Sequence, residues 1–207
     1  MALHNILSKF FEDIQNTSWY EWISTASQIV SVFYAQKNNV LVYPTGMIGV
    51  LLAAWMYWFI ASPPLYADGV LNIYYFIMSV YGWYNWSLKN KEQVEVFTAD
   101  YASKNEIFIG TTILCTSWII LYFSLKYLTN SDTPILDGLV SSSAVVAMWL
   151  MARRRIENWY AWILSNIVAI PLNYYKGFVL FTIMYVLFLG MAIVGHRSWR
   201  KMILTTK

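Results

Sequence analysis

Long runs of apolar residues, separated by short polar breaks, dominate this chain of 207 residues. Seven runs can be distinguished, near residues 19–36, 40–60, 69–88, 107–128, 137–152, 159–175 and 177–195. Several of them approach the roughly 20 residues that an α-helix needs to cross the hydrocarbon core of a bilayer. The runs at 137–152 and 159–175 are shorter and would span only with polar side chains reaching out at their ends. The pattern predicts an all-α integral membrane protein with seven transmembrane helices.

A different pattern precedes the first run. Between Ile6 and Ile14, apolar residues recur at helical spacing and alternate with Lys9, Glu12 and Asp13. A helix of this kind lies on a membrane surface, with its apolar side in the bilayer and its charged side in water. Residues 1–18 are therefore expected to form a short amphipathic N-terminal helix, and a frayed tail is the alternative.

The composition strengthens the membrane assignment. The chain is 58% hydrophobic, 18% aromatic and 12% charged, and its mean hydropathy is +0.46, which is too apolar for an ordinary soluble domain. The net charge of +3 does not indicate nucleic-acid binding, because the basic residues lie in short connections and form no stripe along a helix. Cys115 is the sole cysteine, so a disulfide framework or a thiolate metal site is excluded.

The basic residues indicate the orientation of the chain. Cytoplasmic connections of membrane proteins carry an excess of lysine and arginine. If the C-terminus is cytoplasmic, only Lys9, Lys126 and Lys176 fall outside. The inside connections then hold Lys37, Lys89, Lys91, Lys104, Arg153, Arg154, Arg155, Arg197, Arg200, Lys201 and Lys207. We therefore expect the N-terminus outside and the C-terminus inside.

The chain also repeats itself weakly. Thr25–Ser27 align with Ser141–Ser143 at an offset of 116, and Gly82–Trp86 align with Gly195–Trp199 at an offset of 113. Two three-helix units with a linker helix between them would face the same way across the membrane, as parallel repeats do, with a pathway between the units. Chance similarity between apolar segments is the alternative. The expected division is 19–88 for the first repeat, 89–106 for a cytoplasmic connection, 107–128 for the linker helix, 137–195 for the second repeat and 196–207 for a cytoplasmic tail.

Candidate site residues share one face of the sixth run. At 100° per residue, Trp159, Trp162, Asn166 and Asn173 lie on the same side of a helix. An amide without a partner is costly in hydrocarbon, so the two asparagines should face the interior or a water-filled cavity. Trp159 borders the basic loop, where an interfacial aromatic belt is an equally good interpretation. Trp162 lies deeper and is the stronger candidate for contact with a ligand.

Other runs carry similar polar faces. Asn72, Tyr75 and Ser79 share one side of the third run, Gln28 lies within the first, and Tyr185 lies within the last. These side chains have the same requirement for an interior position. They complete the set of predicted substrate-binding residues.

The chemistry that is missing from the sequence is also informative. None of the seven runs contains an acidic residue away from its ends, so no proton relay is visible. We find no nucleotide-binding loop, no cluster of histidine or cysteine, and no Ser/His/Asp set, and so expect neither an enzyme nor a bound metal or cofactor. A site of indoles, tyrosines and amides suits a planar aromatic solute with hydroxyls and an amide, and it tolerates a delocalised positive charge, because a cation over an indole ring is stabilised by about 0.5–2 kcal/mol.

Several motifs together resemble the PnuC family of vitamin-precursor transporters. They are Arg-Ile-Glu-Asn-Trp-Tyr-Ala-Trp at 155–162, Asn166, Tyr-Tyr-Lys-Gly at 174–177, Tyr-Gly-Trp-Tyr-Asn-Trp at 81–86, and the run to Gly195 and Trp199. The similarity covers roughly residues 19–201. It implies a three-plus-one-plus-three arrangement related to SWEET sugar transporters, assembly into homotrimers, and a contribution of Trp159 and Trp162 to the substrate site.

The resemblance also implies an activity. Family members take up nicotinamide riboside by facilitated diffusion, and a cytoplasmic kinase traps the nucleoside by phosphorylation. We therefore expect a passive uniporter for nicotinamide riboside in a bacterial inner membrane. Thiamine is the alternative cargo, and related subfamilies carry riboflavin or deoxynucleosides. The positions equivalent to Trp159 and Trp162 in the first repeat are Tyr43 and Gly46, so the site is asymmetric. A scaffold subunit without transport is a distant alternative.

Overall fold

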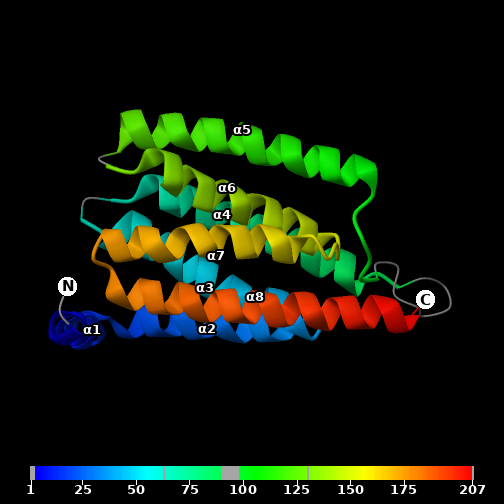
Figure 1. Ribbon diagram of the computed structural model, residues 1–207, viewed down its shortest axis with the longest axis horizontal. Coiled ribbons are helices and arrows are strands. Elements are labelled where there is room, and N and C mark those ends of the chain that lie inside the picture. The colour runs from blue at the N-terminus through cyan, green and yellow to red at the C-terminus, as the bar shows by residue number, and fades with distance from the viewer. Residues whose placement is uncertain (1–2, 63, 90–97, 130, 207) are drawn as a thin grey trace.

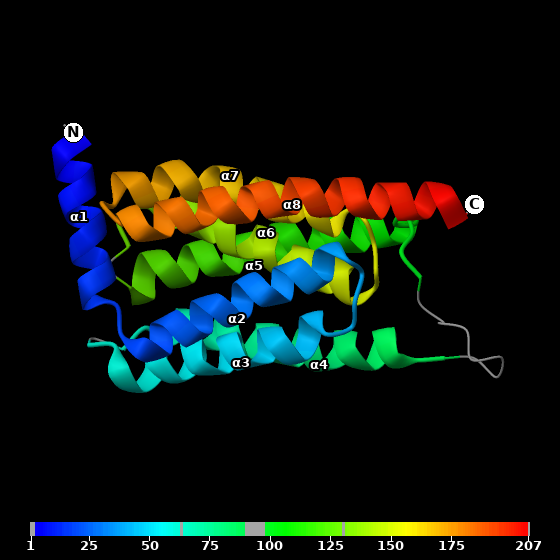
Figure 2. The same ribbon diagram turned by 90° about the horizontal axis from the view of Figure 1, so that it is seen from below.

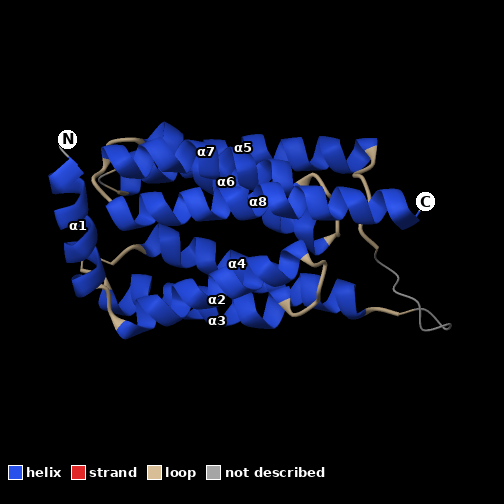
Figure 3. Ribbon diagram, turned by 60° about the horizontal axis from the view of Figure 1, so that its bottom comes forward, coloured by secondary structure: helices blue, strands red, loops and turns tan. Residues whose placement is uncertain are grey.

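The computed structural model describes residues 3–62, 64–89, 98–129 and 131–206. Every regular element in these ranges is a helix, which confirms the all-α prediction (Figure 3). Lys91, part of the predicted cytoplasmic connection, and Lys207 lie outside the described residues. The helices are α1 (Leu3–Asn16), α2 (Trp19–Gln36), α3 (Val42–Trp55), η1 (Met56–Ile60), α4 (Tyr66–Ser87), α5 (Lys104–Leu128), α6 (Pro134–Ala152), α7 (Asn158–Tyr175) and α8 (Val179–Thr206).

Helices α2 to α8 run back and forth along one axis, whereas α1 lies across one end of the bundle (Figure 2). The backbone N–H of Leu180 donates to the carboxylate of Asp13 at 3.2 Å and ties α1 to the start of α8. We call this the α1 end. The opposite end, where α2, α4, α6 and α8 finish, is called the basic end because it holds Lys37, Lys89, Arg153, Arg154, Arg155, Arg197, Arg200 and Lys201.

Six helices form a closed ring. Contacts run from α2 to α3, α3 to α4, α4 to α6, α6 to α7, α7 to α8, and from α8 back to α2. Helix α5 packs on α6 outside the ring and lies at the margin of the bundle (Figure 1). The ring has one seam between α4 and α6 and a second between α8 and α2. Its axis therefore runs between the group α2–α4 and the group α6–α8.

Four helical segments among the described residues are long and apolar enough to cross a membrane: Val42–Ile60, Lys104–Leu128, Pro134–Ala152 and Val179–Thr205. The remaining ring helices, α2, α4 and α7, carry most of the predicted polar site residues, which lower their hydropathy. Only 6% of the apolar stretch of α5 is buried inside the protein. Its outer surface therefore requires an apolar environment.

Helices α4, α5 and α6 each begin three residues before the predicted position, and α8 ends later than predicted. Helix α4 begins at Tyr66 and so includes Asp68 in its first turn. Helix α8 does not end near residue 195 but continues to Thr206. Beyond residue 195 it has neither proline nor glycine, and Trp199 and Ile203, one turn apart, are buried at 0% and 3% exposure. Packing of this turn against the bundle keeps the helix intact.

The turns at the basic end have the same conformation in the two groups of helices. Asn38 and Arg154, which are 116 positions apart, have positive φ angles of 52° and 55°. Their N–H groups donate to the carbonyls of Ala35 and Met151, also 116 apart, at 2.9 Å in both cases. A positive φ is uncommon for residues other than glycine. The turn therefore recurs at the offset that the sequence predicts.

A buried serine contact also recurs, with donor and acceptor exchanged. The hydroxyl of Ser24 in α2 donates to the carbonyl of Gly49 in α3 at 2.9 Å. The equivalent positions are Val140 in α6 and Ser165 in α7, and here the Ser165 hydroxyl donates to the Val140 carbonyl at 3.0 Å. In both pairs the hydroxyl hydrogen-bonds to the backbone of the neighbouring helix. The same contact is thus made by different residues.

Four aromatic residues join the two groups at the basic end. Tyr43 packs edge-to-face on Trp86, with ring centroids 5.1 Å apart. Trp86 lies 5.8 Å from Trp199, and Trp199 packs edge-to-face on Trp159 at 5.7 Å. None of the four is more than 2% exposed. We call these four residues the aromatic seam.

Hydrogen bonds across the ring anchor the aromatic seam. The indole N–H of Trp86 donates to the carbonyl of Met151 at 3.1 Å, and that of Trp199 donates to the carbonyl of Ala35 at 2.8 Å. Both carbonyls belong to the last turn of a helix and also accept the turn N–H of Asn38 or Arg154, so each indole adds a second hydrogen bond. Each group of helices therefore donates an indole hydrogen bond to a carbonyl at a helix end of the other group.

The connection before α5 holds the basic loop in place. Arg153 and Arg155 each donate from Nε to one oxygen of Glu106 at 2.9 Å. This hydrogen bond to the carboxylate raises the pKa of Arg153. The backbone of Asp100 accepts from Ile156 at 3.0 Å, so the two segments lie side by side. The loop that carries the arginines is thus fixed to the start of α5.

Two glycines permit the aromatic seam to pack. A Cβ added at Gly82 would overlap the ring of Tyr43, and one added at Gly195 would overlap the ring of Trp159. We predict that Gly195→Ala lowers the free energy of unfolding by about 1–3 kcal/mol, the usual effect of overpacking. Thermal unfolding of the detergent-solubilised protein would measure the loss.

Gly190 provides a control on the same helix. Among the described residues, nothing lies within 4 Å of a Cβ added there. Gly190→Ala should leave stability unchanged or raise it by up to about 1 kcal/mol, because alanine is the better helix former. Equal unfolding temperatures for the two variants would contradict the proposed packing.

Candidate functional site

The predicted stripe on α7 lies on the buried side of that helix. Trp159 is 1% exposed and Asn166 is 4% exposed, whereas Tyr160 and Ile167 on the opposite side are 57% and 53% exposed. Trp162 is half-buried and packs against the core that contains the aromatic seam. The interior orientation of the stripe follows from these exposures.

Trp159 belongs to the aromatic seam. It packs on Trp199 and over Gly195, so it is too deeply buried for a residue of an interfacial belt. Its indole N–H has no hydrogen-bond partner among the described residues, whereas the Tyr43 hydroxyl at the equivalent position donates to Met151 at 3.3 Å. Its surroundings are those of a core residue.

Asn166 is the predicted amide that best fits a polar ligand. Its side chain lies in the middle of α7 and is almost fully buried. An amide in this position can both donate to and accept from a polar ligand.

Three of the predicted amides are instead bonded within their own helices. Asn173 donates to the carbonyl of Ala169 at 2.8 Å, and Asn72 donates to the carbonyl of Asp68 at 2.9 Å. Gln28 donates to the hydroxyl of Ser24 at 3.3 Å. Each amide retains an acceptor oxygen for a ligand, but its orientation is set by its own helix.

Tyr75 and Tyr185 come together from different groups of helices. Tyr75 lies on α4 with Ser79, which is 4% exposed, one turn further along. Tyr185 lies on α8, about two turns from the start of that helix at the α1 end. Both side chains are half-buried. The nine predicted residues therefore extend along the ring axis from Trp159 at the basic end to Asn72 and Asn173 near the α1 end, and do not form one compact pocket.

Two residues near this site, Asp68 and Tyr57, are not among the predicted ones. Asp68 lies outside the predicted third run, although its spacing to Asn72, Tyr75 and Ser79 is that of one helix face. Starting the helix at Tyr66 would have revealed it. Tyr57 lies in the π-helical segment η1, and nothing in the sequence marks that change of helix type.

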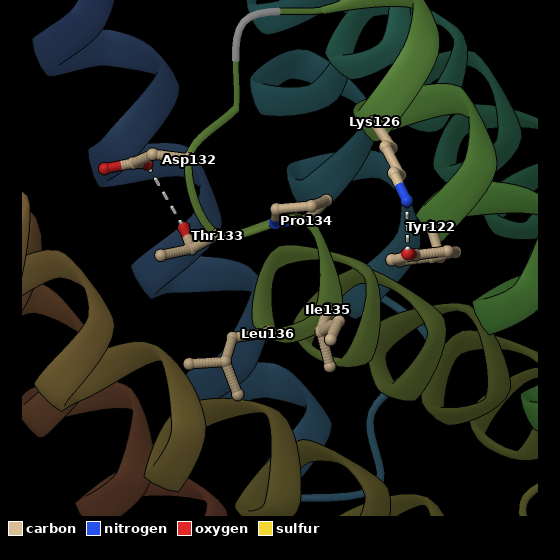
Figure 4. Close-up of a pocket in the computed structure, with 7 residues that line it drawn as sticks. All are labelled: Tyr122, Lys126, Asp132, Thr133, Pro134, Ile135 and Leu136. Carbon is tan, nitrogen blue, oxygen red and sulfur yellow. Dashed lines mark hydrogen bonds between the residues drawn. The ribbon is translucent and has the colours of Figure 1, made fainter.

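Two hollows lie elsewhere, on the outer surface at the α1 end. One, of about 220 Å³, is lined by Tyr122, Lys126, Asp132, Thr133, Pro134, Ile135 and Leu136 (Figure 4). The other, of about 270 Å³, is lined by Thr133, Leu136, Pro171, Leu172 and Tyr175. None of the predicted site residues lines either hollow. They flank the start of α6 and lie outside the ring.

The apolar outer surface and membrane-length helices define a multi-pass membrane protein. The sequence matches the family described as nicotinamide mononucleotide transporter over residues 18–201, and the chain belongs to this family. It is 23% identical over 206 residues to the nicotinamide riboside transporter PnuC of Escherichia coli K12, covering 88% of this chain and 85% of that protein. The identity to PnuC of Neisseria mucosa is 25% over 199 residues, covering 90% and 73%.

Two further similarities concern the fold and a different cargo. The structure resembles the crystal structure of the vitamin B3 transporter PnuC with a TM-score of 0.72 and 24% sequence identity, covering 99% of this chain and 91% of the other. The riboflavin/roseoflavin transporter RibM of Streptomyces davaonensis is 26% identical over 126 residues, or 59% of this chain and 58% of RibM. The resemblance to the PnuC family is thereby confirmed.

The two tryptophans of α7 should respond differently to truncation. Trp159→Ala removes a fully buried indole from the aromatic seam and should destabilise the protein by about 3–5 kcal/mol. Trp162→Ala should leave a folded protein and weaken binding of the transported solute by on the order of 1–3 kcal/mol. Thermal unfolding and calorimetric binding would measure both. A stable Trp159→Ala variant would contradict the core assignment.

Proposed function

We propose that this protein carries nicotinamide riboside across the membrane by facilitated diffusion. Support comes from the family match and from relatives in Escherichia coli and Neisseria mucosa that are named as nicotinamide riboside transporters. The observation that carries the proposal most directly is the composition of the ring interior. Away from the basic end, its buried polar groups are hydroxyls and an amide, those of Ser24, Ser79, Ser142, Ser143, Ser165 and Asn166. Such groups recognise an aromatic amide and a ribose without requiring a charged side chain.

The interior favours a riboside over a mononucleotide, even though the family description names the mononucleotide. A phosphate carries negative charge, and burying it requires cationic side chains or other compensating donors. Among the described ring helices, lysine and arginine occur only in α8, at Arg197, Arg200 and Lys201 toward the basic end. Lys176, which follows α7, is paired with Asp137 at 2.7 Å. The middle of the ring therefore offers nothing that would stabilise a phosphate.

Passive transport follows from the positions of the acidic residues. Glu21, Asp68, Glu106 and Asp137 all lie in the first turn of a helix, where the helix dipole stabilises negative charge. No described residue supplies a carboxylate halfway along the ring that could relay protons. Net uptake then depends on removal of the arriving nucleoside, and phosphorylation by a cytoplasmic kinase would trap it.

The proposed arrangement is a seven-span bundle of two three-helix repeats, α2–α4 and α6–α8, with α5 as the linker. The matching turns at Asn38 and Arg154 support it, as does the exchange of indole hydrogen bonds between the groups. Residence in a bacterial inner membrane and assembly into homotrimers are further parts of this proposal. The exposed surface of α5 is available to lipid or to another copy.

The similarity to RibM makes riboflavin a second candidate cargo, since it extends over 59% of this chain. Thiamine is retained as the alternative because it is also a cationic heteroaromatic, which an aromatic site alone would not distinguish from nicotinamide riboside. A scaffold subunit without transport would bind none of these compounds.

Uptake into proteoliposomes tests the cargo and the mechanism together. We expect counterflow of labelled nicotinamide riboside without any ion gradient, and no comparable counterflow of nicotinamide mononucleotide, thiamine or riboflavin. A protonophore should have no effect, because no proton relay is proposed. Uptake that collapses with the protonophore would refute uniport. Preferential counterflow of another compound would show that this compound, and not nicotinamide riboside, is the cargo.

Reporter fusions test the orientation. The concentration of basic residues at one end of the bundle predicts that this end is cytoplasmic. A fluorescent protein fused after Lys207 should fluoresce, and alkaline phosphatase fused there should be inactive. Active phosphatase at the C-terminus would reverse the orientation.

A further inference from the structure

A polar face of α4 leads from the α1 end into the ring. Asp68, Asn72, Tyr75 and Ser79 follow one another at intervals of four, three and four residues, which places them on one side of a helix. Ser79 is 4% exposed, whereas Val70 and Ile77 on the opposite side are 62% and 58% exposed. The polar face therefore points inward from Asn72 onward, and Asp68, at its outermost turn, is exposed.

The π-helical segment η1 holds a second aromatic residue against this turn. The carbonyl of Tyr57 accepts a hydrogen bond from the N–H of Leu65 at 2.8 Å, and Leu65 directly precedes α4. The indole of Trp58 lies where a Cβ on Gly69 would be, so η1 and α4 are in close contact. Short π-helical segments often occur at functional sites, because they change the direction of the side chains they carry.

Tyr185 approaches the same place from α8, in the other group of helices. Tyr57 in η1, Tyr75 in α4 and Tyr185 in α8 all lie within about three turns of the helix ends at the α1 end, as Asp68 does. No described residue donates to or accepts from the hydroxyl groups of these tyrosines. The Asp68 carboxylate likewise forms no salt bridge with a described residue, and the nearby amine of Lys176 is bound to both oxygens of Asp137 at 2.7 Å. One carboxylate and three tyrosines are thus left available at the α1 end of the axis.

We propose that Asp68, together with Tyr57, Tyr75 and Tyr185, binds the positively charged ring of the cargo at the α1 end of the pathway. A pyridinium or thiazolium ring is a planar, delocalised cation, which is attracted both to a carboxylate and to the faces of tyrosine rings. The hydroxyl groups can bond to polar substituents of that ring. This inference rests on the proposed transport of a cationic nucleoside, and it assigns selection for positive charge to Asp68.

The experiment compares two compounds that differ in charge. Nicotinamide riboside is a cation, and its dihydro form has nearly the same shape without the charge. We expect Asp68→Asn to weaken calorimetric binding of nicotinamide riboside by on the order of tenfold, as for the loss of one partner of a close charge pair. Binding of the dihydro form should change less than about twofold, since it carries no charge for Asp68 to attract.

Two further variants serve as controls. Glu21→Gln removes a carboxylate from the same end, but one that is engaged by the backbone and hydroxyl of Ser18, and should leave the binding of both compounds unchanged. Asp68→Glu retains the charge and should recover most of the affinity for nicotinamide riboside. Thermal unfolding of each variant would identify a loss of binding that is caused by misfolding.

Each outcome decides a separate question. Equal weakening of both compounds in Asp68→Asn, or no weakening of either, would overturn the role of Asp68 in charge selection. If the unmodified protein binds thiamine but not nicotinamide riboside, and Asp68→Asn weakens thiamine binding, the cargo is wrong and the role of Asp68 stands. If the unmodified protein binds neither cation, the proposed function fails and the inference fails with it.

Discussion

Two indole hydrogen bonds across the ring determine how the bundle closes at its basic end. Trp86 and Trp199 each donate to a carbonyl in the last turn of a helix in the other group. Each carbonyl also accepts from the N–H of the turn that follows its helix, and the indole occupies its second acceptor position. The same two indoles are the centre of the aromatic seam. Hydrogen bonding and aromatic packing therefore join the two groups at one place.

The two ends of the ring axis consequently differ. At the basic end the aromatic seam fills the interior, and none of its four residues is more than 2% exposed. Toward the α1 end, half-buried tyrosines and the carboxylate of Asp68 line the polar face of α4. The interior is therefore packed at the basic end and lined by polar side chains toward the α1 end.

The two groups of helices keep the same contacts while their residues diverge. The serine hydroxyl that joins the first two helices of each group comes from α2 in one group and from α7 in the other. Tyr43 uses its hydroxyl to reach Met151, whereas Trp159 at the equivalent position fills the space over Gly195 without a hydrogen bond of its own. The backbone geometry and the serine contact recur in both groups, whereas the hydrogen bond of the buried aromatic residue is made only by Tyr43. The interior can therefore be asymmetric although the turns match.

The sequence by itself determined the helices, because apolar runs of membrane length bounded by prolines, charges and a glycine leave few other structures. It also determined which sides of α4 and α7 face inward, since helical periodicity fixes that from residue spacing alone. Tertiary structure decided the roles of the aromatic residues. From sequence, Trp159 fits an interfacial belt or the site equally well, whereas in the structure it packs into the aromatic seam, because that depends on Trp199 and Gly195 from a distant helix. The position of Tyr57 likewise follows from a π-helical turn stabilised by contact with α4, a long-range effect that local sequence does not encode.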